Sequence, residues 1–179
     1  TTETVQNSQE SKDNFPANEK VFKKQLNFIL EDIKPDAIKI GLIGSYEIAR
    51  VIKNFLVKTK VPIVIDPVVG PTSGKSFLNK KAIEFMRDEL LPIASIVTPN
   101  EDELLKLSNK NNIENSIKFF YELGIKSTLV TGKIKNNTII NYLFSDGSDQ
   151  LQFKNHLLKG NFHGTGCMLS SLLTIFLAK

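Results

Sequence analysis

Cysteine is almost absent from this sequence of 179 residues, and tryptophan is missing altogether. A single cysteine, Cys167, leaves no partner for an intramolecular disulfide and excludes a zinc site built from several cysteines. The sequence also lacks the run of about 18 apolar residues that a membrane-spanning helix requires. It contains no signal-peptide pattern. We therefore expect a protein of the reducing cytoplasm with no membrane partner.

Charge of one sign does not dominate either. The 23 basic residues outnumber the 19 acidic ones only slightly, and the net charge of +4 is spread along the chain. Because the basic residues do not cluster with aromatic ones, a surface for stacking nucleic acid bases has little support. We expect no nucleic acid partner, whereas a small anionic ligand suits this charge equally well.

The residues that are present describe an ordinary globular protein. With 41% hydrophobic and 23% charged residues, the chain can bury a core, and its length suits one domain. The chain starts without methionine and ends within a helical pattern, so we expect residues 1–179 to form a single, partial domain. The polar stretch 1–17 has almost no apolar periodicity and is expected to be a loop or flexible lead-in.

Short apolar runs alternate with amphipathic stretches beyond Asn18. The spacing predicts a first helix from Asn18 to Pro35, and a hairpin around Asp146-Gly147. Strands are expected at 37–40, 62–65, 95–98 and 127–131, and further helices at 46–58, 79–91, 101–107, 113–123 and 165–179. Continuously apolar strands are covered on both faces, which predicts a doubly wound, mostly parallel α/β sheet with helices on both faces.

The most informative residues follow these strands, because open parallel sheets bind ligands beyond the carboxyl ends of their strands. Four strand ends and one turn before the last helix stand out: Lys39-Ile40-Gly41-Leu42, Asp66-Pro67-Val68-Val69-Gly70, Thr98-Pro99-Asn100-Glu101-Asp102-Glu103, Thr131-Gly132 and His163-Gly164-Thr165-Gly166-Cys167. In a parallel sheet the first four share one edge, and the fifth can face them.

The turn from Gly164 to Cys167 is the sharpest local signal. Glycines at a helix start let successive backbone N–H groups point at a phosphate or a developing anion. A cysteine in that first turn would have a depressed pKa and could act as a thiolate base or a hydrogen-bond donor. The alternative is a glycine-rich helix entry with a small buried cysteine.

Two further strand ends each allow two interpretations. Asn100 and Glu103 form the pattern of a capping box, which is sufficient to explain both, but Asn-x-x-Glu could also order water around a divalent ion. Asp66-Pro67 could be a simple turn, or a carboxylate near a metal followed by a flap over phosphate at Ser73-Gly74.

In their order and spacing these motifs resemble the hydroxymethylpyrimidine and phosphomethylpyrimidine kinases of the ribokinase-like superfamily. The agreement runs from about Pro16 to the end of the chain, and the motifs that carry it are Lys39-Ile40-Gly41-Leu42, Asp66-Pro67-Val68, Ser73-Gly74, Leu91-Pro92, Thr98-Pro99-Asn100-x-x-Glu103 and His163-Gly164-Thr165-Gly166-Cys167. Cys167 stands where most sugar kinases of the superfamily have aspartate.

The resemblance implies a ribokinase-like, three-layer fold and an ATP-dependent kinase acting on 4-amino-5-hydroxymethyl-2-methylpyrimidine, its monophosphate or both, in thiamine biosynthesis. It implies Mg²⁺ as cofactor, K⁺ as a further candidate ion, and a homodimer. The implied catalytic residues are Gly164, Thr165, Gly166 and Cys167. The implied nucleotide-binding residues are Asn100, Glu103, Thr131 and Gly132. The implied pyrimidine-binding residues are Gly41, Leu42, Val68 and Cys167. Glu103, Asn100 and, indirectly, Asp66 would serve the metal.

Two alternatives stay open. The first is a related kinase of pyridoxal or of a sugar. The second is a non-catalytic module that binds a nucleotide or a pyrimidine, because the family's opening glycine-rich strand and its closing helices have no counterpart here. About a third of a full-length member is missing by this comparison.

Overall fold

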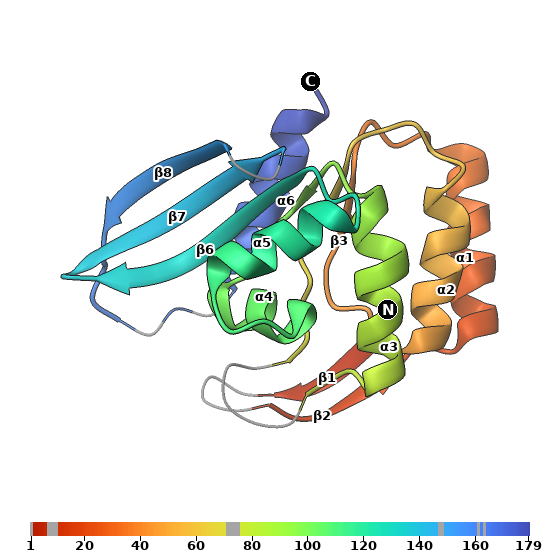
Figure 1. The fold of residues 1–179 in the computed structure, drawn as a ribbon. Helices are drawn as coiled ribbons and strands as arrows, with labels where there is room; N and C mark the ends of the chain where they lie inside the picture. The colour runs from red at the N-terminus through yellow and green to blue at the C-terminus, as the bar shows by residue number, and fades with distance from the viewer. Residues whose placement is uncertain (1, 7–10, 71–75, 147–148, 161, 163) are drawn as a thin grey trace.

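Two β-sheets organise the chain in the computed structural model, which describes residues 2–6, 11–70, 76–146, 149–160, 162 and 164–179. A two-stranded sheet precedes a six-stranded one of order β3-β4-β5-β6-β7-β8 (Figure 1). The strands are β1 (Thr2–Gln6), β2 (Ser11–Pro16), β3 (Ile38–Ile40), β4 (Ile63–Ile65), β5 (Ile96–Val97), β6 (Ser127–Lys135), β7 (Thr138–Ser145) and β8 (Asp149–His156). The helices are α1 (Glu19–Asp32), α2 (Tyr46–Leu56), α3 (Lys80–Phe85), η1 (Met86–Leu90), η2 (Leu91–Ile93), α4 (Glu101–Ser108), α5 (Ile113–Glu122) and α6 (Thr165–Leu177).

The larger sheet is parallel from β3 to β6 and antiparallel from β6 to β8. This confirms the expected mostly parallel sheet and the hairpin at Asp146, whose φ of 48° is the left-handed conformation that such a turn requires. Gly147, the second residue of that predicted turn, lies outside the described residues. Because β3 to β6 are parallel, their carboxyl ends meet at one edge.

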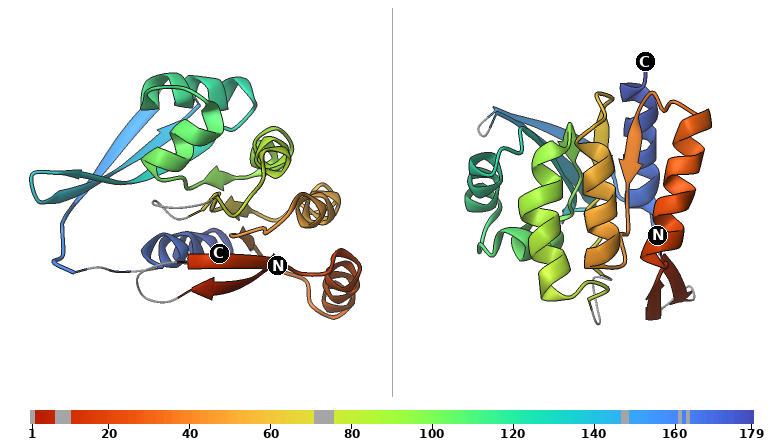
Figure 2. Two further views of the ribbon diagram at one scale, coloured as in Figure 1. Left: turned by 90° about the horizontal axis from the view of Figure 1, so that it is seen from below. Right: turned by 90° about the vertical axis from the view of Figure 1, so that its right-hand side faces the viewer.

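Helices cover both faces of the sheet. Seen end-on, α1, α2 and α3 lie on one side of the parallel strands, and α6 lies on the other (Figure 2). The strands β3, β4, β5 and β6 neighbour one another in chain order, and right-handed crossovers between such strands place their helices on the same face. The last helix, α6, packs against β3 and β4 from the opposite side of the sheet.

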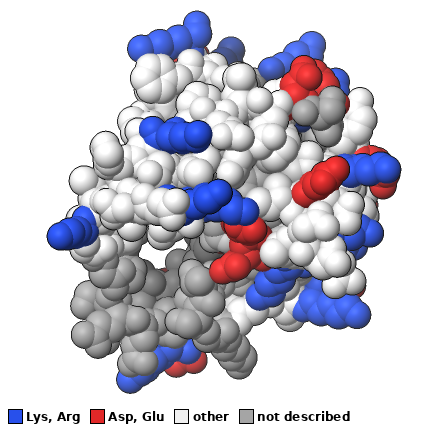
Figure 3. Space-filling model, turned by 60° about the vertical axis from the view of Figure 1, so that its left-hand side comes forward, with Lys and Arg blue, Asp and Glu red and all other residues white. Residues whose placement is uncertain are grey.

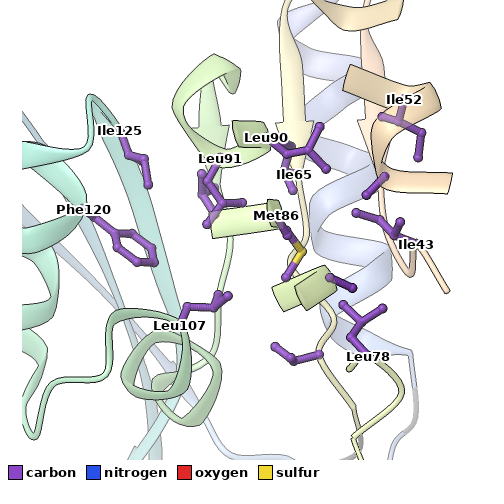
Figure 4. Packing of buried hydrophobic residues seen from close by; sticks show 14 of the residues in the cluster. Ile43, Ile52, Ile65, Leu78, Met86, Leu90, Leu91, Leu107, Phe120 and Ile125 are labelled. Atoms are coloured by element: carbon purple, nitrogen blue, oxygen red, sulfur yellow. The ribbon is translucent and has the colours of Figure 1, made fainter. Parts of the chain in front are cut away.

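The core lies between the parallel strands and the helices of the first face. Ile65 of β4, Leu90, Leu91 and Phe120 are essentially inaccessible, and their side chains converge with those of neighbouring elements (Figure 4). Burying one such side chain contributes about 1.5–3 kcal/mol. This core fixes the positions of β3, β4 and β5, whose ends carry the predicted site.

Side-chain caps set where the helices begin. Asn18, Ser45, Asn79, Asn100 and Asn112 each accept a hydrogen bond from a backbone N–H of the first turn. The helix predicted over 79–91 is less regular than expected, since it changes to a π-helical turn at Met86 and to a 3-10 turn that contains Pro92. Proline lacks the N–H that would continue the α-helical pattern.

The prediction for residues 1–17 was wrong, because β1 and β2 form an antiparallel pair there. Val5 and Phe15 are both about half exposed, so this ribbon has no apolar face whose periodicity would reveal it. The side-chain amide of Asn14 donates to the backbone oxygen of Phe77 at 3.3 Å, and Phe77 N–H donates to Val69 O at 3.0 Å. The ribbon thus attaches beside the carboxyl end of β4.

Candidate functional site

The carboxyl ends of the parallel strands bring the predicted strand-end residues to one edge. Gly41 and Asp66 follow the neighbouring strands β3 and β4, and Asp66 N–H donates to Ile40 O at 2.8 Å. Asn100 and Thr131 form a bridge in the parallel sense beside them, with Thr131 N–H donating to Pro99 O at 2.9 Å. The expected common edge is therefore present.

Asp66 is the centre of this edge. Its residue exposure is only 5%, which is unusual for a carboxylate. Two groups compensate its charge: the Ser170 hydroxyl of α6 donates to Oδ2 at 3.0 Å, and the ammonium of Lys39 lies 3.8 Å from the same oxygen. A buried carboxylate that gathers partners from two other elements has more than the role of a turn residue.

Lys39 lies in one of the predicted strand-end motifs but was given no role there, and Ser170 was not predicted as a site residue. Lys39 belongs to β3 and directly precedes the edge, where an added Cβ at Gly41 would lie 3.3 Å from its Nζ. Ser170 is fully buried, although a serine in a helix commonly bonds only to the carbonyl oxygen four residues earlier. The Ser170 hydroxyl also lies 3.0 Å from Gly166 O. Because it has only one proton to donate, it favours the charged carboxylate of Asp66 over the neutral carbonyl oxygen. The available sequence signal for Ser170 was its spacing, since it lies one helical turn after Gly166 and so on the same face of the helix.

Cys167 lies exposed in the first turn of α6, near Asp66. Partial burial raises the pKa of the Cys167 thiol, and the charge of Asp66 raises it further, whereas Lys39 acts in the opposite direction. The predicted depressed pKa was therefore wrong. The dipole of a helix start favours a thiolate, but burial and the neighbouring carboxylate together outweigh it here. Cys167 is a thiol that can hydrogen-bond Asp66 rather than a ready thiolate.

The turn before Cys167 has the backbone that the glycines predict. Gly164 caps α6 with a φ of 76° and, as a glycine, provides no side-chain cap for the first turn. Gly166 has an ordinary φ, and an added Cβ there meets no atom of the described residues within 4 Å. Gly164, Thr165 and Gly166 are all exposed. Cys167, the next residue in the chain, lies close enough to Asp66 for the carboxylate to raise the pKa of its thiol. His163, the first residue of the motif, lies outside the described residues.

The capping box of Asn100 and Glu103 is complete. Glu103 N–H donates to Asn100 Oδ1 at 2.8 Å, and Asn100 N–H donates to Glu103 Oε2 at 3.0 Å. Burial nevertheless raises the pKa of Glu103 to about 7, and the charge of Asp66 contributes to the rise. A carboxyl group that only caps a helix is most favourable when it is ionised. The raised pKa of Glu103 therefore indicates a functional role in addition to capping α4.

The carboxyl groups of Glu103 and Asp66 suit a magnesium ion that is bound mainly through phosphates. Among the described residues, no three His, Cys, Asp or Glu side chains gather as a complete metal cage. Mg²⁺ is usually held by one or two carboxylates together with waters and substrate phosphates. The Thr98 hydroxyl, buried just after β5, has no hydrogen-bond partner among the described residues, as expected where a further ligand group belongs.

The remaining predicted residues lie around this edge. Leu42 and Val68 are half-buried just beyond β3 and β4. Gly132 has a φ of 77°, and its N–H donates to Asn141 Oδ1 at 2.9 Å, which turns β6 next to Thr131. The predicted flap residues Ser73-Gly74 lie outside the described residues.

Other surfaces of the molecule offer less. A cavity of about 580 Å³ lies between α1 and α2, bordered by Glu19 and Arg50, but no predicted site residue lines it. On the face shown in Figure 3, basic side chains are scattered among acidic ones and broad uncharged areas. Within the described part of the chain, every helix is too short or too polar to cross a lipid bilayer.

A mostly parallel sheet with a buried carboxylate, an acidic capping box and a glycine-rich helix start at one edge defines a ribokinase-like kinase. The family model of phosphomethylpyrimidine kinase matches residues 1–179, so the chain belongs to that family, and its class of activity is phosphotransferase. The hydroxymethylpyrimidine/phosphomethylpyrimidine kinase of Aquifex aeolicus is 35% identical over 94% of this chain and 69% of its own length. A Staphylococcus aureus relative of the same name is 34% identical, over 87% of this chain and 60% of its own length.

Solved structures agree with this assignment. A phosphomethylpyrimidine kinase from Clostridium difficile superposes with a TM-score of 0.78 at 30% identity, over 99% of this chain and 75% of its own. The pyridoxal kinase of Staphylococcus aureus in complex with ADP gives 0.83 at 28% identity, over 99% of this chain and 67% of its own. The same kinase has been solved with AMP-PCP and pyridoxal.

Proposed function

We propose that this protein transfers the γ-phosphoryl group of ATP to 4-amino-5-hydroxymethyl-2-methylpyrimidine, to its monophosphate, or to both, at the edge that carries Asp66. The observation that carries this proposal is the convergence on Asp66 of Lys39 from β3, Ser170 from α6 and the charge-coupled Glu103 from α4. The family membership supports the substrate, and the nucleotide complexes of the related pyridoxal kinase support ATP.

In this proposal the nucleotide lies along Thr131, Gly132 and the start of α6, and the pyrimidine lies near Gly41, Leu42, Val68 and Cys167. The exposed N–H groups of Gly164, Thr165 and Gly166 stabilise the transferring phosphoryl group. Glu103 and Asn100, with Asp66 acting indirectly, would hold a magnesium ion. When bound, such an ion neutralises phosphate charge during the transfer.

The acceptor oxygen attacks the γ-phosphorus, and the bond from that phosphorus to the leaving oxygen of ADP breaks with its electron pair remaining on ADP. A monophosphate acceptor is already anionic and needs no base. An alcohol must lose its proton, and we assign that proton to the Asp66 carboxylate, because the raised pKa of Cys167 leaves its thiol protonated at neutral pH. Cys167 then positions the acceptor by hydrogen bonding.

A pyridoxal kinase is the second candidate, favoured by the superposition on the Bacillus subtilis pyridoxal kinase with a TM-score of 0.86 at 25% identity. A coupled assay of ADP release, run separately with the pyrimidine, its monophosphate, pyridoxal and ribose, separates the candidates. We expect turnover with a pyrimidine substrate to exceed that with pyridoxal and ribose. The pyrimidine assignment is wrong if pyridoxal is preferred, and the kinase assignment is wrong if every acceptor leaves ATP intact.

We infer a single ribokinase-like domain over residues 1–179, a cytoplasmic location, and a homodimer, with K⁺ as a further candidate ion. Light scattering of the purified protein tests the dimer, and turnover in sodium against potassium buffers tests the ion.

A further inference from the structure

The ammonium group of Lys39 lies at the same sheet edge as Asp66. Its Nζ is beside Gly41, at the end of β3, and 3.8 Å from Asp66 Oδ2. The side chain is 24% exposed, so it is neither sealed in the core nor free in solvent. We propose that Lys39 binds the phosphate of the monophosphate substrate and so sets the preference between monophosphate and alcohol; this inference rests on the proposed function.

The distance to Asp66 leaves the lysine available for this role. A hydrogen bond from an ammonium to a carboxylate measures about 2.7–2.9 Å, and 3.8 Å is an ion pair without one. Asp66 Oδ2 already accepts the Ser170 hydroxyl at 3.0 Å. Lys39 therefore compensates the charge of Asp66 at a distance and keeps donors for a ligand, since an ammonium has three.

The position relative to Cys167 points to the acceptor end of the substrate. Lys39 lies close enough to Cys167 to act on its ionisation, and Cys167 lies in the first turn of α6, next to the glycines at which phosphoryl transfer is proposed. A positive charge from β3 thus faces the helix start across the edge. A phosphate placed between them would meet the ammonium on one side and backbone N–H groups on the other.

Charge makes this contact selective. A phosphomonoester carries about −1.5 to −2 charges at pH 7, whereas the alcohol is neutral. The buried carboxylate of Asp66 repels the charged phosphate but does not repel the neutral alcohol. Lys39 offsets that repulsion, so its removal harms the binding of the monophosphate far more than that of the alcohol.

The test compares Lys39→Met with the wild-type protein, using the alcohol and the monophosphate as separate acceptors at saturating ATP. We expect KM for the monophosphate to rise by about tenfold or more, the range of a lost hydrogen bond to a charged group, and KM for the alcohol to change less than about threefold. Lys39→Arg keeps the charge and should recover most of the monophosphate affinity. Lys80→Met removes a lysine from another 3.8 Å ion pair, on the surface of α3, and should change neither.

A binding measurement without ATP separates recognition from turnover. Calorimetric titration with the pyrimidine monophosphate should give weak binding to Lys39→Met, and Asp66→Asn in the same chain should restore part of it by removing the repulsion. Circular dichroism and melting temperature verify that the variants are folded. Equal losses for both acceptors, or a lack of rescue by Lys39→Arg, overturn the role of Lys39 alone. A wild-type protein that phosphorylates neither pyrimidine overturns the proposed function, and the inference with it.

Discussion

Replacing Glu103 by glutamine should make the protein more stable at alkaline pH while it loses magnesium-dependent activity. Glutamine can keep the capping box, because its side-chain oxygen can still accept from Asn100 N–H, as Glu103 Oε2 does at 3.0 Å. What it removes is a carboxylate whose ionisation the site opposes by burial and by the charge of Asp66. Stability and function should therefore move in opposite directions.

The magnitude follows from the pKa of Glu103, which rises from 4.5 to about 7 in the folded protein. Each pKa unit corresponds to about 1.4 kcal/mol, so the folded state resists ionisation by about 3 kcal/mol at most. The side chain retains some exposure to solvent, which screens the effect, and we expect about 1–3 kcal/mol in practice. A neutral isostere gains this amount where the wild-type carboxyl is ionised.

The pH dependence has a definite sign. Between pH 4.5 and 7 the folded protein holds a proton on Glu103 that the unfolded chain has released, so the free energy of unfolding falls as the pH rises through this range. Urea unfolding of wild type and Glu103→Gln, without magnesium, should give nearly equal stabilities at pH 4.5 and an advantage of the variant at pH 8. A constant difference between the two proteins from pH 4.5 to 8 would refute the reasoning, and so would full activity of the variant.

The glycines, the cysteine and the central carboxylate allow three further tests. Gly166→Ala should fold normally, because an added Cβ meets no atom of the described residues within 4 Å, and should still raise KM for ATP about tenfold if its N–H group faces phosphate; an unchanged KM would leave the turn as a helix entry. Cys167→Ser should retain more alcohol kinase activity than Cys167→Ala, since a hydroxyl can replace a hydrogen-bonding thiol; equal losses in both would instead favour a thiolate base. Asp66→Asn should lower the pKa of Cys167, so the rate of alkylation of this single cysteine at pH 8 should rise; a slower rate would contradict the proximity of the two groups.

The sequence alone was sufficient for the parallel part of the fold. Continuous apolar runs such as Ile63–Ile65 are buried on both faces, and their ends are marked by residues that a strand rarely tolerates, such as Pro67 and Pro99. The polar ribbon of residues 2–16 could not be found in this way. Its pairing is between backbone groups, and its side chains leave no pattern that distinguishes it from a loop.

The predicted site was incomplete for a different physical reason. Asp66 could be identified because it directly follows a strand, but its partner Ser170 is 104 residues away and lies on a helix from the opposite face of the sheet. No local pattern encodes such a contact. The prediction of a depressed pKa for Cys167 was wrong for the same reason. The dipole of its own helix is a local effect, whereas the burial that raises the pKa, and the Asp66 carboxylate that adds to it, depend on the tertiary fold.

The charge of Asp66 affects the ionisation of the neighbouring acidic groups at the site. Burial raises the pKa of both Glu103 and Cys167, and the Asp66 carboxylate raises both further. Lys39 acts in the opposite direction at Cys167, and backbone hydrogen bonds do so at Glu103. Without ligands the protein therefore reduces negative charge at the edge by keeping protons on Glu103 and Cys167. Phosphates add negative charge to this edge. A cation that accompanies them lowers the pKa of Glu103, because positive charge favours the ionised carboxylate. Binding of the nucleotide with its metal should therefore release a proton from Glu103 near neutral pH, so the same residue that destabilises the ligand-free fold becomes favourable once the site is loaded.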